Sequence, residues 1–504
     1  MQASVEAVET REVPTADAAP APAEAPAFAA PTATSRLRRR LPQGAIELIG
    51  LAFGISIISA VALGSKLSND EFWQMAAGQW MLAHHAVVGL DPFSYTEAHR
   101  RWVTDEWGSE VALGGLFRAF GNAAYATYAI VLGALSLGAC ALYARALGAR
   151  GGRVAAIVIV LAAGISGVMA GDRGLDFSLV WLPFELFVLT KARSNPRWLW
   201  CLPPLCLAWV NTHGSILFGL IVLGAELGWS LVPERHVARI GGVGQSSHTG
   251  PLALALLGSV VASCLTPYGP GLLAYDVGVS RNSQIAQYIL EWNSPNFHSF
   301  MVLLAYCVPL AVLAACAWTR RLPVLEASLG VVLFLEALQT QRLVIYLMVV
   351  AVGLAASLPM RRAWGSTARR VAGACFAVVA IAILATPSVP PGTVNSSLPV
   401  QAFDYLSMHP GRIFTTYTWG DYSIARHRAT FVDGRTDLFE GPVLTTFFNV
   451  TNLETPPDPV FERYDVSYVV WAPNTALSLY LSHDPRWRVV DRSSVALVFA
   501  RSSP

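Results

Sequence analysis

Acidic side chains stand directly after the first long apolar run of this 504-residue chain. The run ends near residue 64, and Asp70 and Glu71 follow in the segment LSNDEFW. A second acid pair, Asp105 and Glu106, lies near the end of the same polar segment. A charged residue at the centre of a bilayer costs about 2.5–3.5 kcal/mol, and this cost falls away at the membrane edge. The position of Asp70 therefore suits a base that meets a lipid-borne reactant.

The same segment also has the composition of a membrane-surface anchor. Aromatic rings partition to the headgroup region, and the segment contains Trp73, Trp80, Phe93, Tyr95, Trp102 and Trp107. The run FWQMAAGQWMLAHH has helical spacing and predicts a helix that lies on the membrane. In this interpretation the acids are simply solvated, and the residues of the segment alone leave both interpretations open.

Three further polar candidates lie at the ends of later apolar runs. They are Arg173 in GDRGLDFS, His213 in WVNTHG and Arg342 in QRLVIY. Arginine suits bidentate recognition of phosphate. Each candidate has a simpler alternative: a pair with Asp172 for Arg173, a hydrogen-bonded core histidine for His213, and a snorkelling interface side chain for Arg342.

The elements that position these residues are membrane helices. The chain is 54% hydrophobic and 13% charged, whereas soluble proteins average about 25% charged residues. About 20 apolar residues cross a bilayer, and about eleven such runs are present, at 44–64, 122–144, 154–171, 175–190, 198–211, 213–232, 251–267, 300–318, 323–340, 342–359 and 371–387. The net charge of +2 gives no sign of a nucleic-acid partner.

Basic residues gather in every second loop between these runs. The groups are Arg36, Arg38, Arg39 and Arg40; Arg145, Arg150 and Arg153; Lys191, Arg193 and Arg197; Arg235 and Arg239; Arg320 and Arg321; and Arg361, Arg362, Arg369 and Arg370. Because basic loops stay in the cytoplasm, the N-terminus is predicted to be cytoplasmic. The segment with Asp70 then lies outside, and an odd number of crossings places the C-terminal region outside as well.

The two ends differ in composition from the apolar middle. Residues 1–43 are Ala/Pro-rich and predict a disordered cytoplasmic tail. Residues 44–387 form the predicted transmembrane domain, with a first outer loop at 66–121. Residues 388–504 predict a soluble α/β domain, with strands at RIFTTYTW, ATFVDGR, VSYVVWAP and RWRVVDRSSVALVFAR and helices at QAFDYLSMH and DPVFERY.

One stretch of this C-terminal domain, TYTWGDYS, is similar to the W-W-D-Y-G motif of oligosaccharyltransferases. The order of the residues differs, so the acceptor-binding role of that motif is not transferred. The favoured interpretation is that Trp419, Asp421, Asp433 and Arg435 pair or pack at strand ends.

The order of motifs resembles a group of bacterial membrane proteins like the GT-C glycosyltransferases, a superfamily with protein O-mannosyltransferases, the aminoarabinose transferase and oligosaccharyltransferase catalytic subunits. Asp70 and Trp73 fit a D-x-W-W-H run, Asp91–Tyr95 a D-P-F-S-Y run and Glu106-Trp107 the start of E-W-L. Gln74 stands where that pattern has His. GDRGLDFS, LAWVNTHGSILFGL, LTPYG, EWNSP, QRLVIY and VDGRTDLF fit later motifs, so the resemblance covers about Leu51 to the C-terminus.

This resemblance implies a GT-C-like helical fold and a reaction class. GT-C enzymes transfer a sugar from a polyprenyl phosphate or diphosphate at the outer face of the membrane. An acid just after the first span is the catalytic base or a metal ligand, which assigns that role to Asp70, with Glu106 as the second carboxylate. The departing phosphate requires cationic or polar partners, and Arg173, His213 and Arg342 are expected to bind it.

A divalent cation is a further expectation. Oxygen ligands suit Mg²⁺ or Mn²⁺, and Asp70, Glu106 and Glu291 are the candidate ligands. The resemblance leaves metal dependence open, because GT-C members differ in it. The expected partners are a polyprenyl-phosphate-linked sugar, membrane lipids and an acceptor hydroxyl on a glycan, lipid or protein, at the bacterial inner membrane.

Two functions of other classes remain as alternatives. Glu185, Glu226, Glu326 and Glu336 lie inside apolar runs, and intramembrane acids are typical of transporters, so a transporter or flippase of a lipid-linked substrate is one alternative. The other is a non-catalytic scaffold of the same fold that presents its C-terminal domain to a partner.

Overall fold

The computed structural model describes residues 41–67, 70–169, 171, 174–280, 292–359, 389–390 and 393–502. Residues Pro42–Pro504 form one compact unit. The predicted crossing at 371–387 and nearly all of the predicted tail at 1–43 lie outside the described residues.

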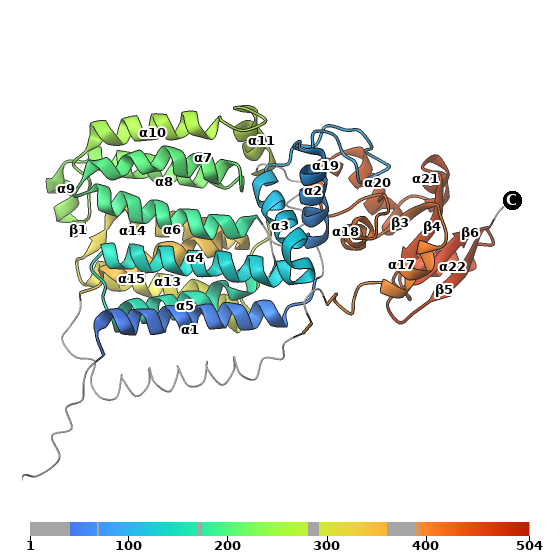
Figure 1. The fold of residues 1–504 in the computed structure, drawn as a ribbon, viewed down its shortest axis with the longest axis horizontal. Helices are drawn as coiled ribbons and strands as arrows, with labels where there is room; N and C mark the ends of the chain where they lie inside the picture. The colour runs from blue at the N-terminus through green and yellow to red at the C-terminus, as the bar shows by residue number, and fades with distance from the viewer. Residues whose placement is uncertain are drawn as a thin grey trace, which may run out of the picture. The chain divides into compact units, whose positions relative to one another are not determined.

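Long apolar helices make up the first part of this unit, and several run side by side (Figure 1). Their bounds follow the predicted apolar runs: α1 (Gln43–Gly64), α4 (Ala124–Ala146), α5 (Gly152–Met169), α6 (Leu175–Ala192), η2 (Pro196–Cys201), α7 (Leu202–Val210), α8 (Ile216–Leu231), α10 (Thr249–Ser263), α13 (Phe300–Trp318), α14 (Val324–Gln339), η4 (Gln341–Leu343) and α15 (Val344–Ser357). Shorter connections are α9 (Glu234–Arg239), α11 (Gly271–Ser280) and the parallel pair β1 (Gly242–Val243) and β2 (Leu322–Pro323).

Three helical segments of the described chain are long and apolar enough to cross a membrane: Gln43–Gly64, Trp107–Ala146 and Gly152–Met169. Four shorter apolar helices are Ile216–Leu231, Thr249–Ser263, Val302–Trp318 and Gln341–Ser357. The helical architecture is thus confirmed, whereas the number of about eleven crossings stays a prediction.

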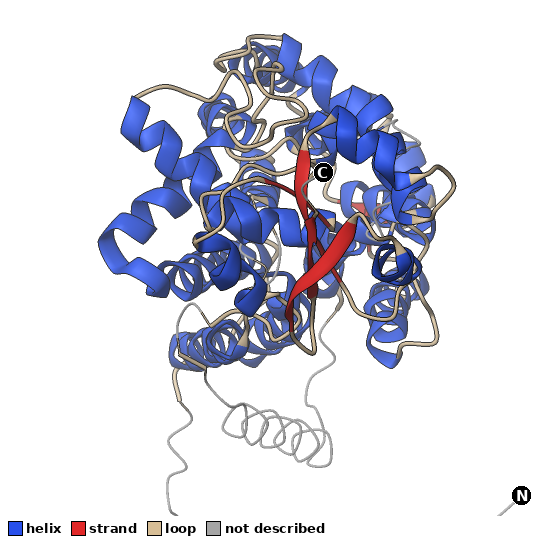
Figure 2. Cartoon of the chain, turned by 90° about the vertical axis from the view of Figure 1, so that its right-hand side faces the viewer, coloured by secondary structure: helices blue, strands red, loops and turns tan. Residues whose placement is uncertain are grey.

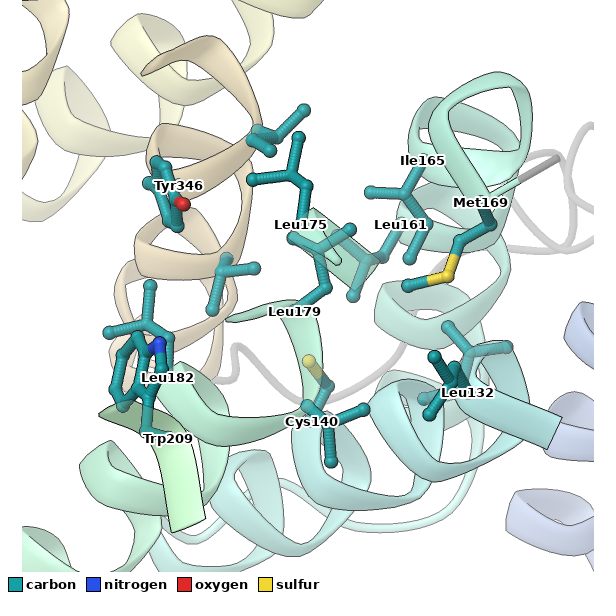
Figure 3. Close-up of a cluster of buried hydrophobic side chains, with 14 of the residues drawn as sticks. Leu132, Cys140, Leu161, Ile165, Met169, Leu175, Leu179, Leu182, Trp209 and Tyr346 are labelled. Carbon is teal, nitrogen blue, oxygen red and sulfur yellow. The ribbon is translucent and has the colours of Figure 1, made fainter. Parts of the chain in front are cut away.

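A continuous apolar core holds the helices together. Figure 3 shows part of it, with Leu132 and Cys140 of α4 and Ile165 of α5 among the buried side chains. Small residues let the helices approach closely: a Cβ atom on Gly50 of α1 would overlap Ala155 of α5. Lipid tails are as apolar as helix surfaces, so in a membrane the hydrophobic effect does not drive helices together. Close packing stabilises their association instead.

Residues 66–121, which the sequence predicts to be the first outer loop, include two helices that pack on each other, α2 (Glu71–His84) and α3 (Trp107–Phe120). A Cβ atom on Gly114 would lie 2.7 Å from the backbone carbon of Gly78, so glycine allows the two backbones to touch. The helix predicted at FWQMAAGQWMLAHH is therefore confirmed. The prediction that this helix lies on the membrane does not account for its packing, because α2 contacts α18 (Tyr417–Ala425) of the C-terminal segment as well as α3.

The aromatic residues of this loop also differ from the prediction of a headgroup anchor. Trp102 is only 3% exposed, and its ring meets Phe93 edge to face at 6.3 Å. The hydroxyl of Tyr95 donates a hydrogen bond to the carbonyl of Ile413 at 2.8 Å. These rings belong to the hydrophobic cluster of the C-terminal segment, since large rings gain most by packing inside protein.

The C-terminal segment has a four-stranded mixed sheet with the order β3-β4-β6-β5 (Figure 2). Strands β3 (Arg412–Thr415) and β4 (Val466–Trp471) pair in parallel, and β6 (Leu497–Arg501) pairs antiparallel with β4 and with β5 (Trp487–Arg492). Its helices are α17 (Val400–Ser407), α18, α19 (Thr436–Phe439), α20 (Pro442–Thr451), α21 (Pro457–Arg463) and α22 (Ala476–His483).

Two of the strand predictions are wrong: RIFTTYTW in its second half and ATFVDGR along its whole length. The TYTW half of RIFTTYTW begins helix α18, because the hydroxyl of Thr416 caps it by accepting from Trp419 N at 3.2 Å. ATFVDGR contributes only a single bridge, from Thr430 to Ser94. Its polar side chains, Thr430, Asp433 and Arg435, form hydrogen bonds with one another instead.

Candidate active site at the first outer loop

Arg435 joins two motifs that lie far apart in the sequence. Its guanidinium donates to both oxygens of Asp433 and to Oδ1 of Asp91, each at 2.7 Å. All three side chains are almost fully buried. The guanidinium also lies 4.5 Å from the centroid of the Trp102 ring, a cation–π contact.

The carboxylates of this triad have further hydrogen-bond donors. Asp91 accepts from the backbone N–H groups of Phe93 and Ser94, and Asp433 accepts from the hydroxyl of Thr430. Every carboxylate oxygen of the triad thus has a donor. The predicted pairing of Asp433 with Arg435 is confirmed, and the triad fastens the C-terminal segment to the first outer loop.

Asp70 stands at the N-terminal end of α2 and faces a second carboxylate across Gly434. Its Oδ1 atom lies 2.8 Å from the point where a Cβ atom of Gly434 would stand. Both oxygens of Asp421, from α18, lie 2.9 Å from the same point. The Gly434 N–H donates to Oδ1 of Asp421 at 2.6 Å, whereas Oδ2 is buried with no hydrogen-bond partner among the described residues.

The surroundings of Asp421 oppose its ionisation. The side chain is 1% exposed, and burial, followed by the charges of Asp70 and Asp433, raises the pKa of Asp421 well above its usual value. The expectation that Asp421 merely pairs or packs misses its place opposite Asp70 across Gly434. Only its place in the similar motif TYTWGDYS drew attention to it in the sequence.

Glu106 is held by two side chains, one on each carboxylate oxygen. Gln74 of α2 donates to Oε2 of Glu106 at 3.0 Å, and Nε2 of His213 lies 3.1 Å from Oε1. Nδ1 of His213 accepts from the Ser215 N–H at 3.0 Å, so Nε2 carries the hydrogen that faces Glu106. The backbone N–H of Gln74 also donates a hydrogen bond to the carbonyl of Asp70 at 3.0 Å. One turn of α2 therefore connects Asp70 to the Glu106–His213 pair.

A second pair of carboxylates lies across Gly214, the residue after His213. Oδ1 of Asp276, from α11, and Oδ2 of Asp105 lie 2.8 and 2.9 Å from the point where a Cβ atom of Gly214 would stand. Burial and the charge of Glu106 raise the pKa of Asp276 to about 7. Burial, and then Glu106 and Asp276, raise the pKa of Asp105 well above its usual value. Asp276 belongs to no recognised motif, so no sequence pattern predicts it as a site residue.

The remaining predicted site residues are placed only in part. Arg173 and Glu291 lie outside the described residues, although Gly174, next to Arg173, abuts the carboxylate of Glu106. Arg342 lies in η4 with its guanidinium 5.9 Å from the centroid of Trp292. Within the part of the chain that the structure describes, Arg342 forms no ion pair, and no three His, Cys, Asp or Glu side chains form a group that could hold a metal ion.

Comparison with known proteins gives matches among solved structures. No protein-family model and no curated protein matches the chain. The oligosaccharyltransferase AglB from Archaeoglobus fulgidus, in complex with an inhibitory peptide and a dolichol-phosphate, matches with a TM-score of 0.58 and 12% identity over 84% of this chain and 69% of AglB. ArnT from Cupriavidus metallidurans, bound to undecaprenyl phosphate, matches with a TM-score of 0.55 and 16% identity over 90% of this chain and 97% of ArnT.

A structure of the Archaeoglobus fulgidus enzyme with Zn and sulfate is also similar, with a TM-score of 0.52 and 11% identity over 85% of this chain and 68% of that one. At these identities the likeness establishes the fold. The chain therefore has the same fold as AglB and ArnT, and three of its described helical segments are long and apolar enough to cross a membrane.

Proposed function

We propose that this protein is a GT-C glycosyltransferase, which moves a sugar from a polyprenyl-phosphate donor to an acceptor hydroxyl at the outer face of the bacterial inner membrane. The observation that carries the proposal is the carboxylate of Asp70, which follows the first membrane helix and faces Asp421 across Gly434. The fold supports it, because two proteins of similar fold bind dolichol-phosphate and undecaprenyl phosphate.

In this proposal Asp70 is the general base. Its carboxylate takes the proton of the acceptor hydroxyl while the hydroxyl oxygen attacks the anomeric carbon of the sugar. The bond from that carbon to the lipid phosphate breaks, and the phosphate leaves with the bonding electrons. The neighbouring carboxylate of Asp421 increases the proton affinity of the pair, since two like charges oppose each other's ionisation.

The second proposed catalytic carboxylate, Glu106, is already oriented. Gln74 and His213 each approach one of its oxygens, so its plane is fixed relative to α2. Because both ring nitrogens of His213 are engaged within the protein, a direct bond from His213 to phosphate requires loss of a contact. We therefore propose that His213 positions Glu106, and that Arg173 and Arg342 bind the phosphate.

A divalent cation, Mg²⁺ or Mn²⁺, remains part of the proposal, with Asp70, Glu106 and Glu291 as its expected ligands. The solved structure of similar fold with Zn and sulfate is weak support for a metal. Asp421, whose oxygens lie on the other side of the Gly434 Cβ position from Asp70, also has carboxylate oxygens, which suit hard cations. A bound cation would supply positive charge for the departing phosphate.

The proposed division of the chain gives each region a role. Residues 44–387 are the transmembrane domain, whose outer loop at 66–121 supplies Asp70 and Glu106. Residues 388–504 are the outer α/β domain, which supplies Asp421. The N-terminal tail at 1–43 is cytoplasmic in this arrangement.

The transporter alternative rests on acids within the membrane, and two of these have partners. The guanidinium of Arg193 lies 3.2 Å from Glu226 and 3.8 Å from Glu326, and the hydroxyl of Tyr143 donates to Glu326 at 2.8 Å. Such pairs are expected where helices pack, so these acids need no transported ion to explain them.

Turnover in nanodiscs tests the enzyme proposal and separates it from the scaffold alternative. Wild type, Asp70→Asn and a matched control, Asp404→Asn at an exposed position, are each given a panel of polyprenyl-phosphate sugars and acceptors. Release of polyprenyl phosphate by wild type and Asp404→Asn is expected, with a loss of about 10²–10⁴-fold in Asp70→Asn. Equal release by folded Asp70→Asn would remove Asp70 as the base.

A further inference from the structure

A chain of side-chain hydrogen bonds leads from the carboxylate of Glu106 into the bundle of apolar helices. Its other members are His213, Ser178, Ser215 and Trp209. We propose that Ser178, of α6, is a positioning residue, which orients His213 and through it Glu106. The proposal rests on the proposed function only in taking Glu106 as part of the reacting site.

Each link of the chain has the length of a hydrogen bond. Nε2 of His213 lies 3.1 Å from Glu106, and Oγ of Ser178 lies 3.0 Å from Nδ1 of the same ring. Oγ of Ser178 also lies 2.5 Å from Oγ of Ser215, which accepts from the indole N–H of Trp209 at 2.9 Å. The chain thus connects α6 with the turn between α7 and α8, whose residues are 35 positions away in the sequence.

Two groups that only donate fix the direction of these hydrogen bonds. They are the backbone N–H of Ser215 and the indole N–H of Trp209. Because Nδ1 of His213 accepts from the Ser215 N–H at 3.0 Å, it carries no hydrogen, and the Ser178 hydroxyl donates to it. Oγ of Ser178 then accepts from the hydroxyl of Ser215. The chain therefore holds His213 in the tautomer whose Nε2–H faces Glu106.

Burial increases the effect of these hydrogen bonds. Ser178 and Trp209 are 0% exposed, and His213 is 6% exposed. In such a place a hydrogen bond is stronger than in water, and neighbouring bonds in a network strengthen one another. Loss of the Ser178 hydroxyl removes a donor from Nδ1 and an acceptor from Ser215, so the ring of His213 is held less firmly against Glu106.

The same network reaches α15, the helix that follows Arg342. Side-chain hydrogen bonds join Tyr346 of α15 to both serines, and Tyr346 is 4% exposed. Helix α15 begins two residues after Arg342. Ser178 is therefore connected both to the helix of a proposed phosphate ligand and to the carboxylate of Glu106.

Three variants test the chain in the full-length protein in nanodiscs: Ser178→Ala, Ser215→Ala and the double variant. The matched control is Ser136→Ala, because Ser136 is also 0% exposed and its hydroxyl donates to the carbonyl of Leu179 at 2.7 Å. Nitrogen NMR of protein with ¹⁵N-labelled histidine reports the ring of His213, whose signals are assigned by their loss in His213→Gln. Release of polyprenyl phosphate gives kcat and KM, and thermal melts show that each variant is folded.

Ser178→Ala is expected to move the Nδ1 resonance of His213, whose donor is lost, and the Nε2–H resonance, which reports the bond to Glu106. Ser215→Ala is expected to move both in the same direction by less, and it tests the chain by itself if Ser178→Ala does not fold. Ser136→Ala is expected to move neither. An unchanged Nδ1 resonance in Ser178→Ala overturns the proposal, and a change confined to Nδ1 overturns the effect on Glu106.

Turnover gives the second readout. Ser178→Ala is expected to lower kcat about 10–100-fold, the range for partners that orient a metal-bound histidine, with KM little changed. Ser215→Ala is expected to add nothing in the double variant, because it acts through Ser178. A kcat of Ser178→Ala equal to that of Ser136→Ala overturns the positioning role, as does a double variant whose loss is the product of the two single losses. No turnover by wild type contradicts the proposed function instead, and the resonances of His213 still decide whether Ser178 orients it.

Discussion

Asp433 and Asp421 both lie in the C-terminal segment and are almost fully buried, at 0% and 1% exposed. Asp433 receives two hydrogen bonds from the guanidinium of Arg435, and the backbone N–H of Arg435 and the hydroxyl of Thr430 also donate to it. Asp421 instead faces Asp70, and one of its oxygens has no partner in the described chain. The same residue type thus occurs once in a neutralised cluster and once in a cluster of like charge.

We propose that this difference separates a structural role of the Asp433 cluster from a functional role of the Asp421 cluster. A buried ion triad with every oxygen paired fixes two segments together, as Arg435 does with Asp91. Carboxylates held against each other are unfavourable for folding, and perturbed groups of this kind gather at functional sites. The comparison predicts opposite responses to the removal of charge in the two clusters.

The largest expected effect comes from removal of the cation in the neutralised cluster. Arg435→Met leaves Asp91 and Asp433 buried without their guanidinium, and breaking a buried pair in this way costs about 3–5 kcal/mol. Thermal unfolding in detergent measures the loss. The control is Arg426→Met, whose partner Asp404 is exposed, and which is expected to change stability by about 0–1 kcal/mol. Equal free energies of unfolding of the two variants would show that the triad does not stabilise the contact between the C-terminal segment and the loop at 66–121.

The next effect concerns the geometry of the like-charged cluster. A Cβ atom on Gly434 would stand 2.8–2.9 Å from three oxygens of Asp70 and Asp421, so Gly434→Ala forces the two carboxylates apart. A displacement of about 1 Å at a reacting group can cost 10²-fold in rate, and turnover is expected to fall by that order. Gly115→Ala is the matched control, since no atom lies within 4 Å of its Cβ position.

If Gly434→Ala turns over its substrate as fast as Gly115→Ala, the spacing of Asp70 and Asp421 has no part in the reaction. The melting temperatures of both variants show whether a loss of turnover reflects unfolding instead.

A further effect is the pH dependence of stability that Asp276 confers, measured with a chelator present. Its pKa in the folded protein is raised to about 7, whereas an unfolded aspartate has a pKa of about 3.9. Between these values the folded state binds more protons, so stability falls as pH rises, by up to about 1.4 kcal/mol per pH unit. Melting of wild type and Asp276→Asn from pH 4 to 8 measures this. An unchanged slope in Asp276→Asn would assign the titration to another group.

Most of the helices can be predicted from the sequence, whereas few of the contacts in the candidate site can. Apolar runs of bilayer length predict most of the helices, and the β-branched run VSYVVW predicts β4. The prediction of a strand at TYTW is wrong, because the helix cap at Thr416 and the contact of α18 with α2 outweigh the strand propensity of these residues. Local interactions are visible in a sequence, whereas these tertiary contacts are not.

The site shows the same limit more strongly. DPFSY and VDGRTDLF are both recognisable motifs, but their contact joins Asp91 to Arg435 across 344 positions. Asp421 and Asp276 acquire their character from burial beside Asp70 and Asp105. No pattern in a single sequence gives such proximity. The sequence predicts Asp70, Glu106 and His213 as site residues, but it predicts neither Asp276 nor the place of Asp421 opposite Asp70.

The thermal stability of Asp433→Asn and Asp421→Asn at pH 7.5 tests the central claim most directly. The two substitutions are identical in chemistry and are made at sites of equal burial. Asp433→Asn is expected to melt lower than wild type, because Arg435 loses an ionic partner. Asp421→Asn is expected to melt at the wild-type temperature or higher, because a like charge next to Asp70 is removed. A lower melting temperature for Asp421→Asn, equal to that of Asp433→Asn, would contradict the division into a neutralised structural cluster and a like-charged functional one.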